Sequence, residues 1–111
     1  MALQQLRPED AASLCASDAP PLLLDVREGW EVAVAAIHAG TAPECHIPMG
    51  RIPERLAELD TEQPVVCICH HGMRSEQVAH FLERQGFAAV YNLAGGIDAW
   101  AEQVDTSVPR Y

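Results

Sequence analysis

One short stretch of this chain combines a nucleophile with groups that would activate it. An apolar run, Val65-Val66-Cys67-Ile68-Cys69, is followed by the polar segment His70-His71-Gly72-Met73-Arg74-Ser75. Such a pattern predicts a buried strand that delivers Cys69 to its carboxyl end, then a loop, and then a helix. The thiol would lie beneath backbone N–H groups and a helix N-terminus, which favour a thiolate nucleophile. The stretch therefore predicts a cysteine-based transfer enzyme.

The loop after Cys69 has the residues needed to hold a negatively charged sulfur. Successive N–H groups of residues 70–75, curled around the sulfur, would form an anion-binding nest. Gly72 would let the chain curl, since a nest often needs a positive φ. A helix dipole beginning near Ser75 would add favourable potential, and Arg74 would add a fixed charge or a clamp on the loop carbonyls. This chemistry requires no metal and no organic cofactor.

The other cysteines and histidines have less specific interpretations. Cys67 is expected to be a buried small hydrophobe, with a resolving thiol as the alternative. A metal site at Cys67-x-Cys69-His70-His71 is disfavoured, because the sequence offers no second ligand pair of standard spacing. His70 and His71 either contact substrate or are solvated loop residues. We expect Cys15 to pack on a helix face and Cys45 to be an exposed loop thiol, and we expect structural or surface positions for His38, His46 and His80.

Alternating patterns along the chain predict the elements that position this loop. Helices are expected at 8–16, 28–37, 52–59, 75–85 and 97–103, strands at 22–26, 65–69 and 87–93, and a short strand at 46–47 within an extended loop, 38–48. Trp30 and Trp100 are expected in the core. Strands separated by helices imply a three-layer α/β fold, in which a mainly parallel central sheet has helices on both faces. Sites in such sheets lie at the carboxyl ends of the strands, where Cys69 falls.

Composition and charge narrow the class of protein. A chain of 111 residues is expected to form a single domain, 1–111. The formal net charge is −9 and all seven basic residues are arginines, a balance that disfavours nucleic acid as a partner. No apolar run has the length of a membrane span, and the first residues lack the pattern of a secretory signal. We expect a reduced, cytoplasmic enzyme, with a mature secreted form as the alternative.

Four segments together resemble the single-domain rhodaneses, sulfurtransferases that carry sulfur as a cysteine persulfide. In the family's order, these are LLDVRE at 23–28, HIPM at 46–49, CHHGMR at 69–74 and VYNLAGGIDAW at 90–100. The third matches the family's active-site loop of Cys, two variable residues, Gly, one variable residue and Arg. The resemblance covers nearly the whole chain. Residues 34–44 depart from it, since they separate Trp30 from His46 by more residues than a compact member needs.

The resemblance implies that Cys69 accepts a sulfane sulfur and passes it to a thiophilic acceptor. The donor would be thiosulfate or a low-molecular-weight persulfide, and the acceptor a thiol or cyanide, with a sulfur-relay protein as a further candidate partner. The resemblance places the substrate-binding loop around Cys69, with residues in supporting positions beside it. The loop comprises His70, His71, Gly72, Met73 and Arg74, and the supporting residues are Asp25, Arg27 and Ser75.

Two alternatives to sulfur transfer follow from the same resemblance. In rhodanese-like families, a six-residue loop from Cys to Arg is associated with sulfur transfer, and a loop one residue longer with phosphatases and arsenate reductases. A tetrahedral oxyanion needs a wider cradle than one added sulfur atom, and the loop from Cys69 to Arg74 is the shorter version. The second alternative is a non-catalytic rhodanese-like module that binds a protein partner. The presence of Cys69 argues against it.

Overall fold

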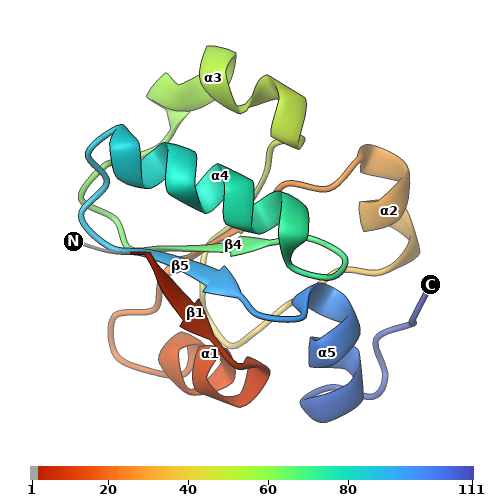
Figure 1. Ribbon diagram of the computed structural model, residues 1–111. Helices are drawn as coiled ribbons and strands as arrows, with labels where there is room; N and C mark the ends of the chain where they lie inside the picture. Colours follow the sequence, from red (N-terminus) through yellow and green to blue (C-terminus); the bar gives the residue numbers. More distant parts are fainter. Residues whose placement is uncertain (1–2) are drawn as a thin grey trace.

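The computed structural model describes residues 3–111, which form a five-stranded sheet with helices on both faces (Figure 1). The strand order is β1-β5-β4-β2-β3, and every neighbouring pair is parallel. The strands are β1 (Gln4–Leu6), β2 (Leu22–Asp25), β3 (Glu44–His46), β4 (Val65–Ile68) and β5 (Val90–Leu93). The helices are α1 (Pro8–Cys15), α2 (Gly29–Val34), α3 (Ile52–Arg55), α4 (Met73–Arg84) and α5 (Gly96–Gln103), with 3₁₀ turns η1 (Met49–Arg51) and η2 (Leu56–Glu58) flanking α3. The predicted three-layer α/β architecture is confirmed.

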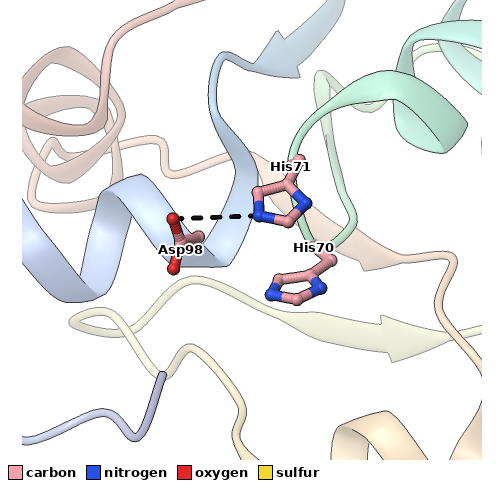
Figure 2. Close-up of side chains that lie close together, drawn as sticks. All are labelled: His70, His71 and Asp98. Carbon is pink, nitrogen blue, oxygen red and sulfur yellow. Dashed lines mark ion pairs between the residues drawn. The ribbon is translucent and has the colours of Figure 1, made fainter. Parts of the chain in front are cut away.

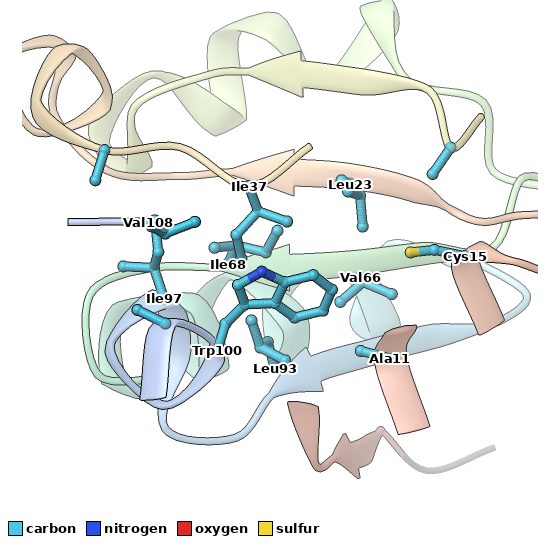
Figure 3. Close-up of a cluster of buried hydrophobic side chains, with 13 residues drawn as sticks. Ala11, Cys15, Leu23, Ile37, Val66, Ile68, Leu93, Ile97, Trp100 and Val108 are labelled. Atoms are coloured by element: carbon cyan, nitrogen blue, oxygen red, sulfur yellow. The ribbon is translucent and has the colours of Figure 1, made fainter. Parts of the chain in front are cut away.

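Two apolar layers sandwich the sheet, because alternate side chains of a strand point to opposite faces. On one face, Trp100 of α5 packs with side chains of α1 against Val66 and Ile68 (Figure 3). On the other face, side chains of α3 and α4 cover Val65 and Cys67. All four residues of β4 are therefore buried, as expected for a central parallel strand. The expected core position of Trp100 is confirmed, since only 4% of it is exposed.

The predicted helix at 28–37 is three residues too long at its C-terminal end. Helix α2 ends at Val34, and Ala35 is already in an extended conformation. Ile37 enters the core from the extended segment after the helix. Trp30 is 65% exposed, so its predicted core position is also wrong. The helix buries Glu31 instead, whose carboxylate pairs with Arg74.

Other elements differ from prediction mainly at their ends. The predicted helix at 52–59 is interrupted, so that only 52–55 is α-helical between two 3₁₀ turns. The short strand in the loop before it begins two residues earlier than predicted, at Glu44. Strand β1, which pairs with β5 at the sheet edge, was not predicted, because two exposed glutamines and one partly buried leucine carry too little periodicity to show it. Within residues 3–111, no helix combines the length and apolar character needed to cross a membrane.

Candidate active site

Cys69 follows directly after β4, and its sulfur faces three hydrogen-bond donors. The backbone N–H of Gly72 lies 3.1 Å from Sγ, and the backbone N–H of Ser75 lies 3.3 Å from it. The Ser75 hydroxyl is 3.2 Å from the same sulfur. Cys69 itself is only 1% exposed. The sequence predicted such a cradle of N–H groups, and the structure forms it from Gly72 and Ser75.

The local backbone explains why these donors point at the sulfur. Gly72 has φ +98° and directly precedes α4, which begins at Met73, two residues earlier than predicted. The first N–H groups of a helix lack partners within it, so the Ser75 N–H in the first turn is free to face Sγ. A side chain at position 72 would also crowd the neighbouring turn, because a Cβ there would lie 3.1 Å from the Gly95 nitrogen. Both conformation and space therefore require glycine.

The carbonyls of the loop are held from the opposite side by α5. The N–H of Ile97 donates to the Cys69 carbonyl at 2.9 Å, and that of Asp98 donates to the His70 carbonyl at 3.1 Å. Gly96 permits this approach, since a Cβ there would lie 2.4 Å from both carbonyl oxygens. The loop carbonyls thus point toward α5, and the N–H groups of the loop remain available to the sulfur. The sequence analysis offered Arg74 as a possible clamp on these carbonyls. In the structure, the first turn of α5 holds them instead.

Arg74 instead forms an ion pair with a carboxylate that the sequence analysis missed. Its two Nη atoms lie 2.7 and 2.9 Å from the carboxylate oxygens of Glu31, which is only 4% exposed. The bidentate pair with Arg74 lowers the pKa of Glu31 to about 2. The one sequence signal was the spacing of Glu28 and Glu31, which form a capping box at the start of α2. That spacing predicts a helix start, but it does not predict the partner 43 residues later.

Asp25 and Arg27 lie beside this ion pair rather than at the sulfur. Arg27 is fully buried, and its guanidinium donates to the Asp25 carboxylate at 2.6 Å and to the Ala35 carbonyl at 2.7 Å. It also donates to the Tyr111 hydroxyl at 2.9 Å, and that hydroxyl donates to Glu31 at 2.8 Å. These contacts fix the end of β2, the segment after α2 and Tyr111 relative to one another. They connect to the active-site loop through the pair that Glu31 forms with Arg74.

His70 and His71 lie on the outside of the loop in a stack of three rings. The His70 ring is 3.9 Å from the Tyr111 ring and 4.0 Å from the His71 ring, centroid to centroid. Burial, reinforced by the neighbouring His71, lowers the pKa of His70. On the other side of the stack, Nε2 of His71 lies 3.9 Å from the Asp98 carboxylate (Figure 2). The stack thus joins the loop to Tyr111 and to α5.

The donor atoms of His70, His71 and Asp98 all lie within 4.8 Å of one another, which raises the question of a metal. The planes of the two imidazole rings are stacked at 21°, so one ion cannot lie close to both planes, as imidazole coordination requires. Asp98 is also paired with Arg110, at 2.9 and 3.1 Å. We therefore assign no ion to this cluster.

Met73 and the other three cysteines do not face the Cys69 sulfur cradle. Met73 belongs to the loop, but it is 75% exposed and its side chain points to solvent. Cys67 is fully buried, and burial raises its pKa, as expected for an inert thiol. Cys15 packs on a helix face as predicted. Cys45 is half-buried on β3, so its predicted place as an exposed loop thiol is wrong. All four cysteines are free thiols.

Comparisons with known proteins agree with this architecture. A family model described as "Rhodanese-like domain" matches residues 7–103. "Putative sulfurtransferase YtwF" of Bacillus subtilis (strain 168) is 47% identical over 79 residues, which are 70% of this chain and 71% of that protein. "Thiosulfate sulfurtransferase GlpE" of Coxiella burnetii is 40% identical over 62 residues, or 56% of this chain and 58% of that protein. The solution structure of a polysulfide-sulfur transferase homodimer from Wolinella succinogenes superposes with a TM-score of 0.74 at 32% identity, covering 91% of this chain and 74% of the other.

Proposed function

This chain belongs to the rhodanese-like domain family, and from that premise we propose that it is a sulfurtransferase that carries a sulfane sulfur as a persulfide on Cys69. The observation that supports this most directly is the cradle around Sγ. Two backbone N–H groups and one hydroxyl face the sulfur at 3.1 to 3.3 Å, all from the loop and the first turn of α4. Donors held in place in this way stabilise a charge on sulfur with little rearrangement.

The reaction divides into two displacements at sulfur. The Cys69 thiolate attacks the outer sulfur of thiosulfate, forming an S–S bond while the bond to the sulfite group breaks and its electron pair leaves with sulfite. In the second step, cyanide or a thiolate attacks the outer sulfur of the persulfide. Thiocyanate or a new persulfide leaves, and the Cys69 thiolate is regenerated. Neither step needs a metal or an organic cofactor, and the low exposure of Cys69 shields the intermediate from water.

The relatives suggest the chemistry of the donor. One is named a thiosulfate sulfurtransferase and another a polysulfide-sulfur transferase, and both names describe donors with an anionic sulfane sulfur. We propose thiosulfate or a low-molecular-weight persulfide as the donor and a thiol or cyanide as the acceptor, with a sulfur-relay protein as a further candidate. His70, His71, Gly72 and Arg74 would border the donor, and Asp25 and Arg27 would support them.

The size of the loop favours sulfur transfer over phosphate or arsenate chemistry. The N–H groups of Gly72 and Ser75 already meet the cysteine sulfur itself at hydrogen-bond distance. The six-residue loop is thus closed around one sulfur atom, whereas a tetrahedral oxyanion needs a ring of donors beyond it. A non-catalytic binding module would not need such a cradle at a buried thiol.

The free thiols also bear on where the enzyme works. Four free cysteines, one of them proposed as the nucleophile, suit a reducing compartment, and we propose a cytoplasmic enzyme that functions as a single domain, 1–111. Oxidising surroundings would instead convert a reactive thiol to disulfides or oxyacids.

The test is intact mass spectrometry after incubation with thiosulfate or a low-molecular-weight persulfide. The protein should gain about 32 mass units, one sulfur atom, and lose them on addition of cyanide. Cys69→Ser should abolish both the adduct and thiocyanate formation. Cys45→Ser is the matched control, since it changes a half-buried thiol on another strand, and it should retain both. Sulfur transfer that persists in Cys69→Ser would refute the proposal.

A further inference from the structure

Asn92 is a buried polar residue, and two of its three side-chain hydrogen bonds lead to the Cys69 site. It lies in β5, is 2% exposed, and occupies a strand position where an apolar side chain would be expected. Its Nδ2 donates to the Gly72 carbonyl at 3.0 Å and to the Gln5 side-chain oxygen at 2.9 Å. Its Oδ1 accepts from the Ser75 hydroxyl at 2.5 Å. A buried amide is costly unless its hydrogen bonds are satisfied, and here every one is.

These contacts fix the orientation of the amide and couple it to the sulfur. Because both protons of Nδ2 are donated to oxygens, Oδ1 has to face Ser75. Asn92 thus holds the two residues that donate to Cys69: Gly72 by its carbonyl, and Ser75 by its hydroxyl. Its side-chain hydrogen bonds go to Gln5, Gly72 and Ser75 and not to the sulfur, so its influence on the sulfur passes through Gly72 and Ser75.

The Ser75 hydroxyl has one proton and two acceptors within reach. It lies 2.5 Å from Oδ1 of Asn92 and 3.2 Å from Sγ of Cys69. A hydroxyl cannot donate to both at full strength, and its oxygen can also accept a proton from a thiol. A neutral Cys69 thiol can therefore donate to Ser75 while Ser75 donates to Asn92. An anionic sulfur has no proton to give, and the Ser75 hydroxyl can then donate to it.

We propose that Asn92 is a positioning residue of the Cys69 site, which aligns the Gly72 N–H and the Ser75 hydroxyl with the sulfur. The inference rests on the proposed function for its role in turnover, in which the charge leaves Sγ when the outer sulfur is added and returns when it is removed. Loss of Asn92 releases the Gly72 carbonyl and leaves Ser75 without its fixed partner.

The test measures alkylation of Cys69 by iodoacetamide as a function of pH, with no sulfur donor present. Thiolate attack displaces iodide, so the pH midpoint reports on how well the site stabilises the anion. Ser75→Ala should slow alkylation near pH 7 about tenfold, as expected for the loss of one hydrogen bond to a charged group, and Ser75→Thr should restore it to within about twofold. Asn92→Ala should also raise the midpoint, because Gly72 and Ser75 lose the contacts that align their donors with the sulfur. Its effect should be smaller in the Ser75→Ala background, because part of its influence passes through Ser75.

Tyr91→Phe is the matched control, since it removes a hydroxyl from the neighbouring residue of β5, whose side chain packs on the other apolar layer. It should leave the midpoint unchanged. Asn92→Ser, a smaller polar change, serves as the second variant if Asn92→Ala melts below the assay temperature, and it should shift the midpoint in the same direction.

An Asn92 variant that is folded and has the wild-type midpoint would overturn the inference, and so would an effect undiminished by Ser75→Ala. Because alkylation needs neither donor nor acceptor, these outcomes are separate from the mass-adduct test of sulfur transfer. A normal persulfide adduct with an unchanged midpoint in the variants would refute the role of Asn92 alone.

Discussion

Replacing Glu31 by glutamine should change how the stability of the protein depends on pH. The ion pair with Arg74 lowers the pKa of Glu31 from 4.5 to about 2. At about 1.4 kcal/mol for each pKa unit, this corresponds to at most ~3 kcal/mol. The Arg74 side chain is 36% exposed, so solvent screening reduces the expected contribution to roughly 1–2 kcal/mol. Glutamine keeps the size of the side chain and one acceptor oxygen, but it has no charge for Arg74.

The sign follows from the lowered pKa. The contribution of Glu31 is fully present above pH 4.5, its unfolded value, and is lost as the pH falls through about 2. Urea unfolding at pH 7, 5, 4 and 3 should therefore show Glu31→Gln less stable than wild type by roughly 1–2 kcal/mol at pH 7, with about half of the difference or less remaining at pH 3. Glu54→Gln is the control, because its pair with Arg51 is more than half exposed on both sides. It should cost less than about 0.5 kcal/mol. A gap between wild type and Glu31→Gln that is constant over this pH range would refute the reasoning.

Three further predictions concern the loop. Inserting one glycine between Gly72 and Met73 should abolish persulfide formation, because the insertion moves the Ser75 N–H away from the sulfur. Sulfur transfer by a variant that circular dichroism shows to be folded would contradict the role of loop size. Gly96→Ala should lower Tm far more than Gly29→Ala, because a Cβ at 96 lies 2.4 Å from two loop carbonyl oxygens and one at 29 meets nothing within 4 Å; equal Tm values from calorimetry would contradict this. His70→Ala should alter the change in thiosulfate KM between pH 7.5 and 6.5 only weakly, because burial lowers the pKa of His70 and so reduces the charge that its ring carries over this range. Initial rates at half-unit steps that show most of the change lost in the variant would contradict this.

The sequence predicted the parts of the fold that repeat a strong local pattern. The run at 65–69 and the helix after it were found because an apolar strand, a glycine turn and an amphipathic helix each leave a clear signal. The cysteine at the strand end and the loop around it followed from the same pattern. Trp30 shows where such reasoning fails: its spacing fits a buried helix face, yet the helix is too short and the side chain stays in solvent.

The residues of the site that the sequence analysis did not predict are held by partners far away in the chain. Glu31 is buried because Arg74 reaches it across 43 residues, and no local pattern marks a carboxylate for such a partner. Asn92 is close to Ser75 only because β5 pairs with β4, and its further partner, Gln5, sits on the unpredicted strand β1. The sequence therefore predicted the cysteine proposed as the nucleophile and the loop around it, whereas the residues that support them could be found only from the order of the strands in the sheet.

These supporting residues bear on how a protein of net charge −9 can hold an anionic sulfur. Two arginines of this region are already paired with carboxylates, Arg74 with Glu31 and Arg110 with Asp98, so neither brings an unopposed positive charge to the loop. What faces the Cys69 sulfur is a set of neutral dipoles, two N–H groups and a hydroxyl, backed by the first turn of α4. Dipoles fixed by the fold favour an anion without a mobile counterion that has to leave when the charge moves to the outer sulfur. The site thus suits the proposed cycle, in which a negative charge leaves Sγ when the outer sulfur is added and returns when it is removed.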